Sequence, residues 1–225
     1  YCGAGTAAVA ALLNITLPHT PPSAKGSKSG LIDIMGLRSM ELMKDRNFSV
    51  FIILSFLAMI PFTLYFSYLS QFLQDAGFKY ITVTMKWRQL AEMFFMLLGP
   101  VAIKSIGLRW TMIVGLAVLG IRYLALYLGG VLEMQTLYFV AILVHGIIFG
   151  FFYVGGQIYI DKKAPAALKA QAQGFIFLIT FGLGMLVANF VNAQLIDLYT
   201  IGEKGIEWNF IWRDTTIFTI LLLVV

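Results

Sequence analysis

The sequence predicts an all-α membrane protein, because its composition and the length of its apolar runs both call for lipid as the solvent. Hydrophobic residues make up 60% of the 225 residues and charged residues only 12%, whereas a soluble domain carries about 25% charged residues. The mean hydropathy is +0.85. Each complete apolar run exceeds the roughly 20 residues that cross the hydrocarbon of a bilayer.

Residues 1–17 are predicted to be the end of a preceding transmembrane helix. They are small and apolar and stop at LPHTPP, where prolines prevent the helix from continuing. No charged leader precedes them, so they do not read as a signal peptide. Because both ends of the chain lie in apolar runs, we expect the sequence to be a fragment.

Residues 18–47 are predicted to form a basic loop with a short amphipathic helix. Within it Leu31, Ile34, Leu37 and Met40 recur at a spacing of three, which is typical of a helix lying on a membrane surface.

Residues 48–225 are predicted to form a bundle of six transmembrane helices, the last of them truncated. The apolar runs lie at 48–73, 80–103, 109–130, 135–160, 169–197 and 212–225. The connections are short, so neighbouring helices are expected to be antiparallel.

The basic residues predict the orientation of this bundle. Three alternate loops hold ten of the sixteen lysines and arginines (Lys25, Lys28, Arg38, Lys44, Arg46, Lys104, Arg109, Lys162, Lys163 and Lys169). The positive-inside rule places these loops in the cytoplasm. The net charge of +5 then reflects membrane topology, and nucleic acid is not an expected partner.

The run HGIIFGFFYVGGQIYIDKKAP carries a stripe of small and polar residues on one helical face. Gly146, Gly150, Tyr153 and Gln157 fall at i, i+4, i+7 and i+11 among bulky apolar residues. Lipid offers a polar stripe no hydrogen bonds. We therefore interpret the stripe as the wall of a permeation pathway.

Gln89 and Glu92 share a face of the second run. Glu92 is expected near the bilayer midplane, where an ionisable group is costly and suits reversible protonation. The alternative is a structural ion pair with Arg122, which is equally deep on the next helix.

Two helices carry the signs of a substrate site. Pro61, near the middle of the first run, kinks that helix ahead of Tyr65 and Tyr68, and the fourth run is rich in glycine. Interrupted helices at corresponding positions of two inverted triplets indicate a substrate site in transporters. The alternative for the glycines is close helix packing.

A flat ligand is one candidate for this site. The aromatic side chains expected to stack on it, and the amides expected to hydrogen-bond it, are Tyr65, Tyr68, Phe149, Phe152, Tyr153, Gln89 and Gln157.

Other polar and aromatic residues are given structural roles. His145 is expected to be an interior or interface group, and Asn189 and Asn192 to bond across helices. Trp208 and Trp212 are expected to anchor the protein at the membrane interface.

An enzyme finds little support, because the chain has no HExxH, GxSxG or glycine-rich phosphate loop. With two histidines and one cysteine, no metal site and no cofactor are expected.

Several of these segments resemble the nucleoside:proton symporter family of the major facilitator superfamily. They are LPHTPP, MKWRQLAEMFFMLL, KSIGLR and HGIIFGFFYVGGQIYIDKKAP followed by AQAQGF. The resemblance implies a twelve-helix transporter with two six-helix halves around a central cavity, of which this chain is the C-terminal half. Residues 18–47 are then the cytoplasmic loop between the halves.

The same resemblance implies the activity and its partners. A family member in a bacterial inner membrane takes up nucleosides together with protons by alternating access, and its N-terminal half is the partner of this one. A glutamine and an acid three residues apart in helix eight correspond to Gln89 and Glu92. They help to bind the nucleoside or to couple the proton.

One position departs from the family pattern. Where the family has an acid after the first aromatic residue of its tenth helix, this chain has Gly150 between Phe149 and Phe151. The departure keeps an uncoupled nucleoside facilitator as an alternative. Two others are a transporter of a sugar or a drug, and a membrane receptor or scaffold that transports nothing.

Overall fold

The computed structural model describes residues 2–19, 30, 36–202 and 205–224. The chain divides into two compact units, Tyr1–Leu31 and Ile32–Val225. In the first unit, α1 (Cys2–Ile15) is apolar and exposed along its length. Of the predicted amphipathic helix, Leu31 and Ile34 lie outside the described residues, and Leu37 and Met40 belong to the 3₁₀ helix η1 (Leu37–Lys44).

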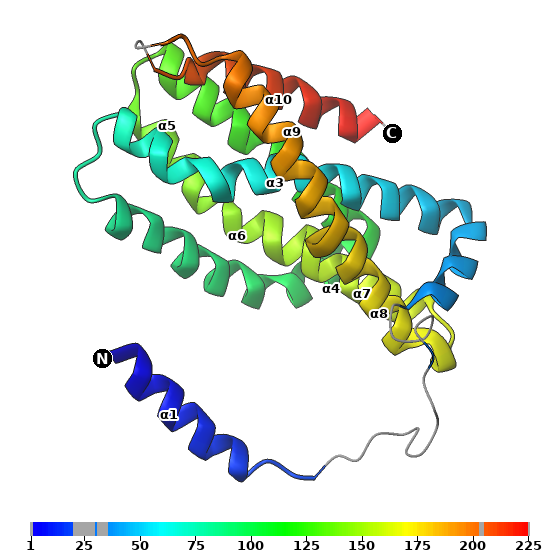
Figure 1. The fold of residues 1–225 in the computed structure, drawn as a ribbon. Helices are drawn as coiled ribbons and strands as arrows, with labels where there is room; N and C mark the ends of the chain where they lie inside the picture. The colour runs from blue at the N-terminus through cyan, green and yellow to red at the C-terminus, as the bar shows by residue number, and fades with distance from the viewer. Residues whose placement is uncertain (1, 20–29, 31–35, 203–204, 225) are drawn as a thin grey trace. The chain divides into compact units, whose positions relative to one another are not determined.

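The second unit opens with α3 (Arg46–Asp75), which runs through the bundle (Figure 1). Asp45 caps this helix by accepting a hydrogen bond from the backbone N–H of Phe48 at 3.0 Å. An acceptor at this position satisfies one of the amide groups that have no partner in the first turn. Pro61 lies inside α3, as predicted.

The next element, α4 (Ile81–Val131), is broken at Gly107. Its 51 residues would extend about 77 Å as one straight helix, far more than a bilayer. Gly107 has φ 83° and ψ 158°, a conformation available only to glycine at low cost. The break separates two helical arms, 81–106 and 108–131, which match two of the predicted runs.

Two further long helices contain π-helical segments. Residues 135–163 comprise α5 (Gln135–Leu143), α6 (His145–Ile147), η2 (Ile148–Val154) and α7 (Gly155–Lys163), and residues 166–198 comprise η3 (Ala166–Leu168), α8 (Lys169–Phe177), η4 (Leu178–Gly184) and α9 (Met185–Leu198). In η2 and η4 the hydrogen bonds run from i to i+5, a pattern frequent at functional sites.

The last described helix, α10 (Trp208–Val224), packs against α4. It begins four residues before the predicted run. Trp208 Nε1 donates a hydrogen bond to Asp75 at the end of α3 (2.8 Å), and this bond joins the first turn of α10 to the bundle.

The prediction of an all-α membrane protein is confirmed. Four helices in the described part of the chain are long and apolar enough to cross a membrane: Arg46–Asp75, Ile81–Val131, Gln135–Lys163 and Ala166–Leu198. One extensive apolar cluster joins side chains of α3, α4, α5, η2, α9 and α10. In Figure 1, α9 crosses in front of α3, and the two helices are in contact.

The region of Pro61 is where three other helices bond to α3. Tyr123 of α4 donates to the carbonyl of Pro61, and Asn192 of α9 donates to that of Ile60 (3.0 Å). Tyr153 of η2 donates to Ala58 (3.4 Å). Each bond satisfies a polar side chain where lipid could not.

The prediction that Asn189 and Asn192 bond across helices is confirmed by the contacts between α9 and α3. Besides the Asn192 bond, Asn189 of α9 accepts a hydrogen bond from Ser67 of α3 at 3.3 Å.

The prediction that Trp208 and Trp212 anchor the protein at the membrane interface is wrong. Trp212 is completely buried and packs against Phe72 and Tyr123 in the apolar cluster. Trp208 is also buried and stacks on Trp212 at 5.5 Å. The first turn of α10 points inward, so neither indole lies on the surface of this unit.

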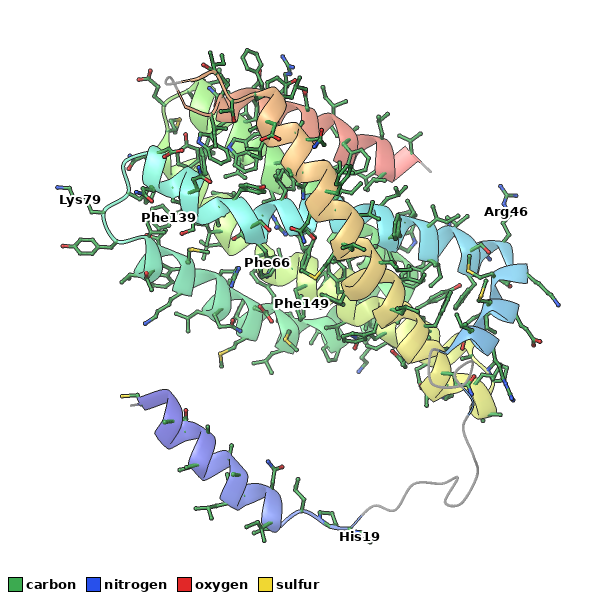
Figure 2. The ribbon with its side chains drawn as sticks, in the orientation of Figure 1. His19, Arg46, Phe66, Lys79, Phe139 and Phe149 are labelled. Atoms are coloured by element: carbon green, nitrogen blue, oxygen red, sulfur yellow. The ribbon has the colours of Figure 1, made fainter. Side chains whose placement is uncertain are left out.

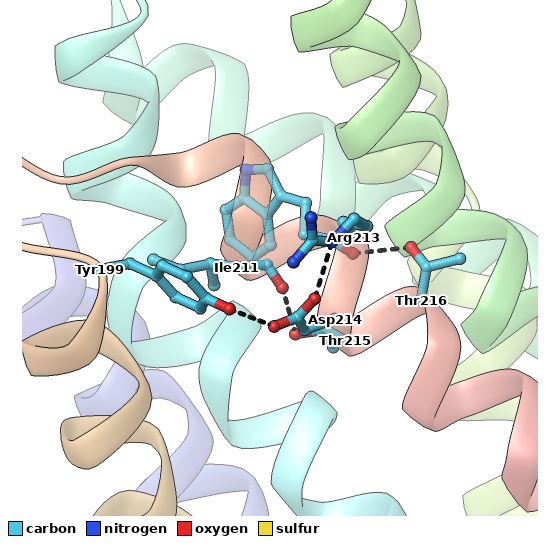
Figure 3. Close-up of polar contacts among 7 residues, drawn as sticks. Tyr199, Ile211, Arg213, Asp214, Thr215 and Thr216 are labelled. Atoms are coloured by element: carbon cyan, nitrogen blue, oxygen red, sulfur yellow. Dashed lines mark hydrogen bonds and ion pairs between the residues drawn. The ribbon is translucent and has the colours of Figure 1, made fainter.

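A polar cluster lies next to these tryptophans, at the end of the bundle away from Lys163. Tyr199 donates a hydrogen bond to Asp214, whose other oxygen accepts from Arg213 Nε at 2.8 Å (Figure 3). Thr215 and Thr216 of the same helix donate to backbone carbonyls one turn back, both at 2.7 Å. The cluster joins the end of α9 to the start of α10.

Candidate functional site

A carboxylate and an imidazole meet in the interior of the bundle. Glu92, in the first arm of α4, places its Oε2 3.7 Å from Nε2 of His145, the first residue of α6. The His145 side chain is 1% exposed, and that of Glu92 is 18% exposed. Glu92 therefore reaches both the interior and the surface of this unit.

Aromatic rings enclose the imidazole. Tyr65 of α3 stacks on it almost in parallel (5.4 Å, 9°), and Phe149 of η2 stacks less closely (6.3 Å, 25°). Phe66 meets it edge-on at 5.4 Å, and Phe62 lies at 6.0 Å. Figure 2 shows Phe66 and Phe149 close to one another in the middle of the bundle.

Two guanidinium groups border these rings. Arg122, in the second arm of α4, lies 4.2 Å above the Tyr65 ring, and Arg88 lies 4.6 Å from the Phe66 ring. Arg122 is completely buried, and its three guanidinium nitrogens have no hydrogen-bond partner in the described part of the chain. Its nearest partners are π faces, a favourable geometry for a cation.

The direct Glu92–Arg122 pair considered from the sequence is not formed. Within the described residues, Glu92 is within ion-pair distance of His145 and Arg122 contacts Tyr65 and Tyr123. Arg122 thus contacts the ring of Tyr65, and Glu92 lies next to the ring of His145, which stacks on Tyr65.

Gly146 brings the two helices of this site together. A Cβ atom at Gly146 would lie 2.4 Å from the carbonyl oxygen of Ala91 and 2.7 Å from the backbone nitrogen of Glu92. Only a residue without a side chain permits this contact. The close-packing alternative for this glycine holds, and the contact places Glu92 beside His145.

The predicted ligand-binding residues divide into two groups. Tyr65, Phe149 and Tyr153 belong to one aromatic assembly with Phe62, whose ring lies 4.5 Å from that of Tyr153. Of the others, Gln89 is exposed and Tyr68 is half-buried beside the apolar cluster.

Phe152 and Gln157 lie nearer the basic end of the bundle. Phe152 packs on Phe51 (6.4 Å) and against the backbone of α4 at Gly115. The backbone carbonyl of Gln157 accepts a bond from Gln173 (2.7 Å). The stripe was predicted with 3.6 residues per turn, whereas the i→i+5 turn in η2 changes the helical phase between residue 150 and residue 157.

Two small cavities flank η2. One, of about 20 Å³, is lined by Phe51, Ser55, Tyr153, Gln157, Thr180 and neighbouring residues. Since one water needs about 10–15 Å³ on this measure, the cavity has room for about one water and does not hold a nucleoside by itself.

The second cavity, of about 110 Å³, lies beside Gly150 and is lined by Met96, Gly99, Pro100, Ile103, Gly150, Val154 and Ile158. A Cβ at Gly150 would make ordinary contacts of 3.5 Å with Met96 and Phe95. The position that departs from the family pattern therefore has room for a side chain.

Two members of the site were not predicted from the sequence to have a functional role. His145 was expected to be an interior group and Arg122 a structural one, and both lie in the same stack as Tyr65. The available signal was that each is an ionisable residue inside an otherwise apolar run, which is costly in lipid. Phe62 and Phe66 gave no such signal among the many phenylalanines of the chain.

Comparisons with known proteins agree on one family. The family model described as Nucleoside H+ symporter matches residues 1–225. YegT of Escherichia coli K12 is 34% identical over 211 residues, which are 92% of this chain and 49% of YegT. The nucleoside permease NupG of the same organism is 26% identical over 224 residues, 94% of this chain and 53% of NupG.

The fold has a counterpart among solved structures. A crystal structure of a mutant of the nucleoside transporter NupG superposes with a TM-score of 0.81 at 22% identity, covering 100% of this chain and 58% of that one. The chain thus spans about half the length of the relatives that it matches.

Proposed function

Because the chain belongs to the nucleoside H+ symporter family, we propose that it is the C-terminal half of a transporter that imports nucleosides together with protons by alternating access. The relatives named as a nucleoside permease and a xanthosine permease support nucleosides as the substrate class. The family is one of transporters, so an enzymatic role is not part of the proposal.

The observation that carries the proposal is the half-buried carboxylate of Glu92 beside a buried imidazole and stacked aromatic rings. A carboxylate that reaches both the interior and a surface can bind a proton on one side of the membrane and release it on the other. In this proposal Glu92 couples the proton, the partly exposed ring of Phe149 offers a stacking face to a nucleoside base, and the buried rings of Tyr65 and Tyr153 form the aromatic wall behind it.

The remaining predicted contacts belong to a cavity shared with the other half. Gln89 is exposed on the same arm of α4 as Glu92, and its amide is free to hydrogen-bond a ribose or a base. Tyr68, Phe152 and Gln157 are proposed to line the same pathway on either side of the central stack. The N-terminal half of the transporter supplies the opposite wall.

The proposal also includes the membrane and the orientation. We propose a bacterial inner membrane, with residues 18–47 and the loop at Lys162–Lys163 in the cytoplasm. The Lys163–Asp45 bond at 2.7 Å brings two of these basic segments to one end of the bundle, which supports a common side.

The deciding experiment is uridine uptake by vesicles that contain the complete transporter with Glu92→Gln. The amide keeps the size of the side chain but cannot take up the proton, so accumulation driven by a pH gradient should cease while counterflow persists. Continued pH-driven accumulation would show that Glu92 is not the coupling group. Equilibration without accumulation in the unchanged protein would favour the facilitator that Gly150 suggests.

A further inference from the structure

The imidazole of His145 faces a single carboxylate. Its Nε2 lies 3.7 Å from Glu92 Oε2, a little beyond the roughly 2.7–3.2 Å of a nitrogen–oxygen hydrogen bond. A movement of less than about 1 Å would therefore bond the two groups.

No other described group uses the nitrogens of this ring. Both Nδ1 and Nε2 of His145 are buried and lack a hydrogen-bond partner in the part of the chain that the structure describes. The ring is held between Tyr65 and Phe149, which fix its plane. Stacking explains an aromatic ring at this position, but it does not explain an imidazole with two free nitrogens.

Among the charged groups around the ring, Glu92 is the carboxyl group that can exchange a proton with the imidazole. From α4 the facing groups are Glu92, Arg88 and Arg122, and from α3 it is Tyr65. Tyr153 of η2 contacts Phe149, which stacks on the imidazole. The charged groups around the imidazole are therefore one carboxylate and two permanent cations. The two guanidinium groups cannot accept a proton from Glu92, whereas the imidazole can.

Building on the proposed function, we infer that His145 shares the coupling proton with Glu92. When the pair holds one proton, the carboxylic acid donates it to Nε2, or the imidazolium donates Nε2–H to the carboxylate. The imidazolium then releases the proton on Nδ1 to water. This leaves a neutral ring with Nε2–H hydrogen-bonded to the carboxylate. Exchange with water, which takes the Nε2 proton and returns one to Nδ1, frees Nε2 to accept the next proton from Glu92, so one proton enters and one leaves per cycle.

The first test measures how uptake depends on pH. The complete transporter is reconstituted with His145→Gln, His145→Phe, Glu92→Gln or His19→Gln, and labelled uridine uptake is followed at external pH values from about 5 to 8, beside counterflow at equal pH. His19 is the other histidine of the chain and is exposed in a loop. It serves as the matched control.

Removing one of two proton acceptors should weaken proton binding. Both His145 variants should move the pH of half-maximal driven uptake downward by about one unit, a tenfold loss of proton affinity. This midpoint is the readout, because a loss of packing alone would not move it. His19→Gln should behave as the unchanged protein. If driven uptake and counterflow fall together and the midpoint does not move, His145 is only a packing residue.

A second measurement does not depend on a His145 variant. In a complete transporter with isotope-labelled histidine, in which His19 and every histidine of the N-terminal half are replaced by glutamine, the infrared bands of the imidazole and of the Glu92 carboxyl should titrate with one midpoint. Two separate midpoints would overturn the inference. If the unchanged protein shows neither driven uptake nor counterflow of uridine, the proposed function fails; if Glu92→Gln alone uncouples uptake, only the role of His145 fails.

Discussion

At the scale of single residues, the site depends on buried polar groups that ordinary packing would not retain. Arg122 is completely buried, stacks on Tyr65 and has no hydrogen-bond partner in the described chain. An unpaired buried charge costs several kcal/mol, and replacing buried ionic groups by apolar ones is often neutral or stabilising. The guanidinium is therefore expected to serve transport at the expense of stability.

Arg122→Met should keep or raise the melting temperature and reduce nucleoside counterflow at least about tenfold. The thioether chain fills the same space against Tyr65 without a charge. The measurement pairs thermal unfolding of the purified transporter with counterflow in liposomes. Arg46→Met, at an exposed arginine, is the control. A drop in melting temperature of more than about 5 °C would show that Arg122 is structural.

Gly146→Ala should destabilise the transporter by about 1–3 kcal/mol and impair proton-driven uptake. The added Cβ would lie 2.4 Å from a backbone oxygen of α4, so the helices must separate and Glu92 must leave His145. Gly174→Ala is the matched control, because a Cβ there meets nothing within 4 Å and alanine favours the helix. Equal stability of the two variants would contradict the close contact.

At the scale of secondary-structure elements, the start of α3 and the end of α7 are joined by one ion pair. Asp45 accepts from the backbone of Phe48 (3.0 Å) and from Lys163 Nζ (2.7 Å). The Lys163 hydrogen bond, followed by that of Phe48, lowers the pKa of the Asp45 carboxyl below its ordinary value of 3.8. A group with a lowered pKa stabilises the folded state above its unfolded pKa and loses that contribution as the pH falls.

The first turn of α3 should therefore become more dynamic as the pH drops below about 4. Hydrogen–deuterium exchange of residues 46–50 measures this loss. Asp45→Asn keeps a capping side chain but has no charge. The protection of residues 46–50, corrected for the intrinsic pH dependence of amide exchange, should therefore be lower at neutral pH in this variant and unaffected by acid. A first turn in Asp45→Asn with the same acid response as the unchanged protein would exclude this carboxyl as the cause.

At the scale of the whole molecule, the positions of the basic loops predict a sidedness that chemistry can test. Lys79 is exposed in the connection between α3 and α4, and Lys162 is exposed in the last turn of α7. The distribution of basic residues places Lys162 in the cytoplasm and Lys79 outside. This orientation remains a prediction.

On a Cys2→Ser background, Lys79→Cys should react with an impermeant maleimide in intact cells, and Lys162→Cys only in inverted vesicles. Cys2 is the single cysteine of this chain, and any cysteine of the N-terminal half is replaced by serine in the same background. The opposite labelling pattern would reverse the topology and place the coupling proton on the wrong side for import.

The sequence by itself determined the solvent, the long helices and the candidate carboxylate, because hydropathy, proline and an ionisable residue in an apolar run are local properties. Only the tertiary structure decided which side chains meet. Gly146 against Ala91 brings Glu92 to His145, and the π turn of η2 separates Phe149 from Gln157. These contacts depend on helix phase and on the packing of segments that are distant in the sequence, and the spacing of residues within one apolar run predicts neither.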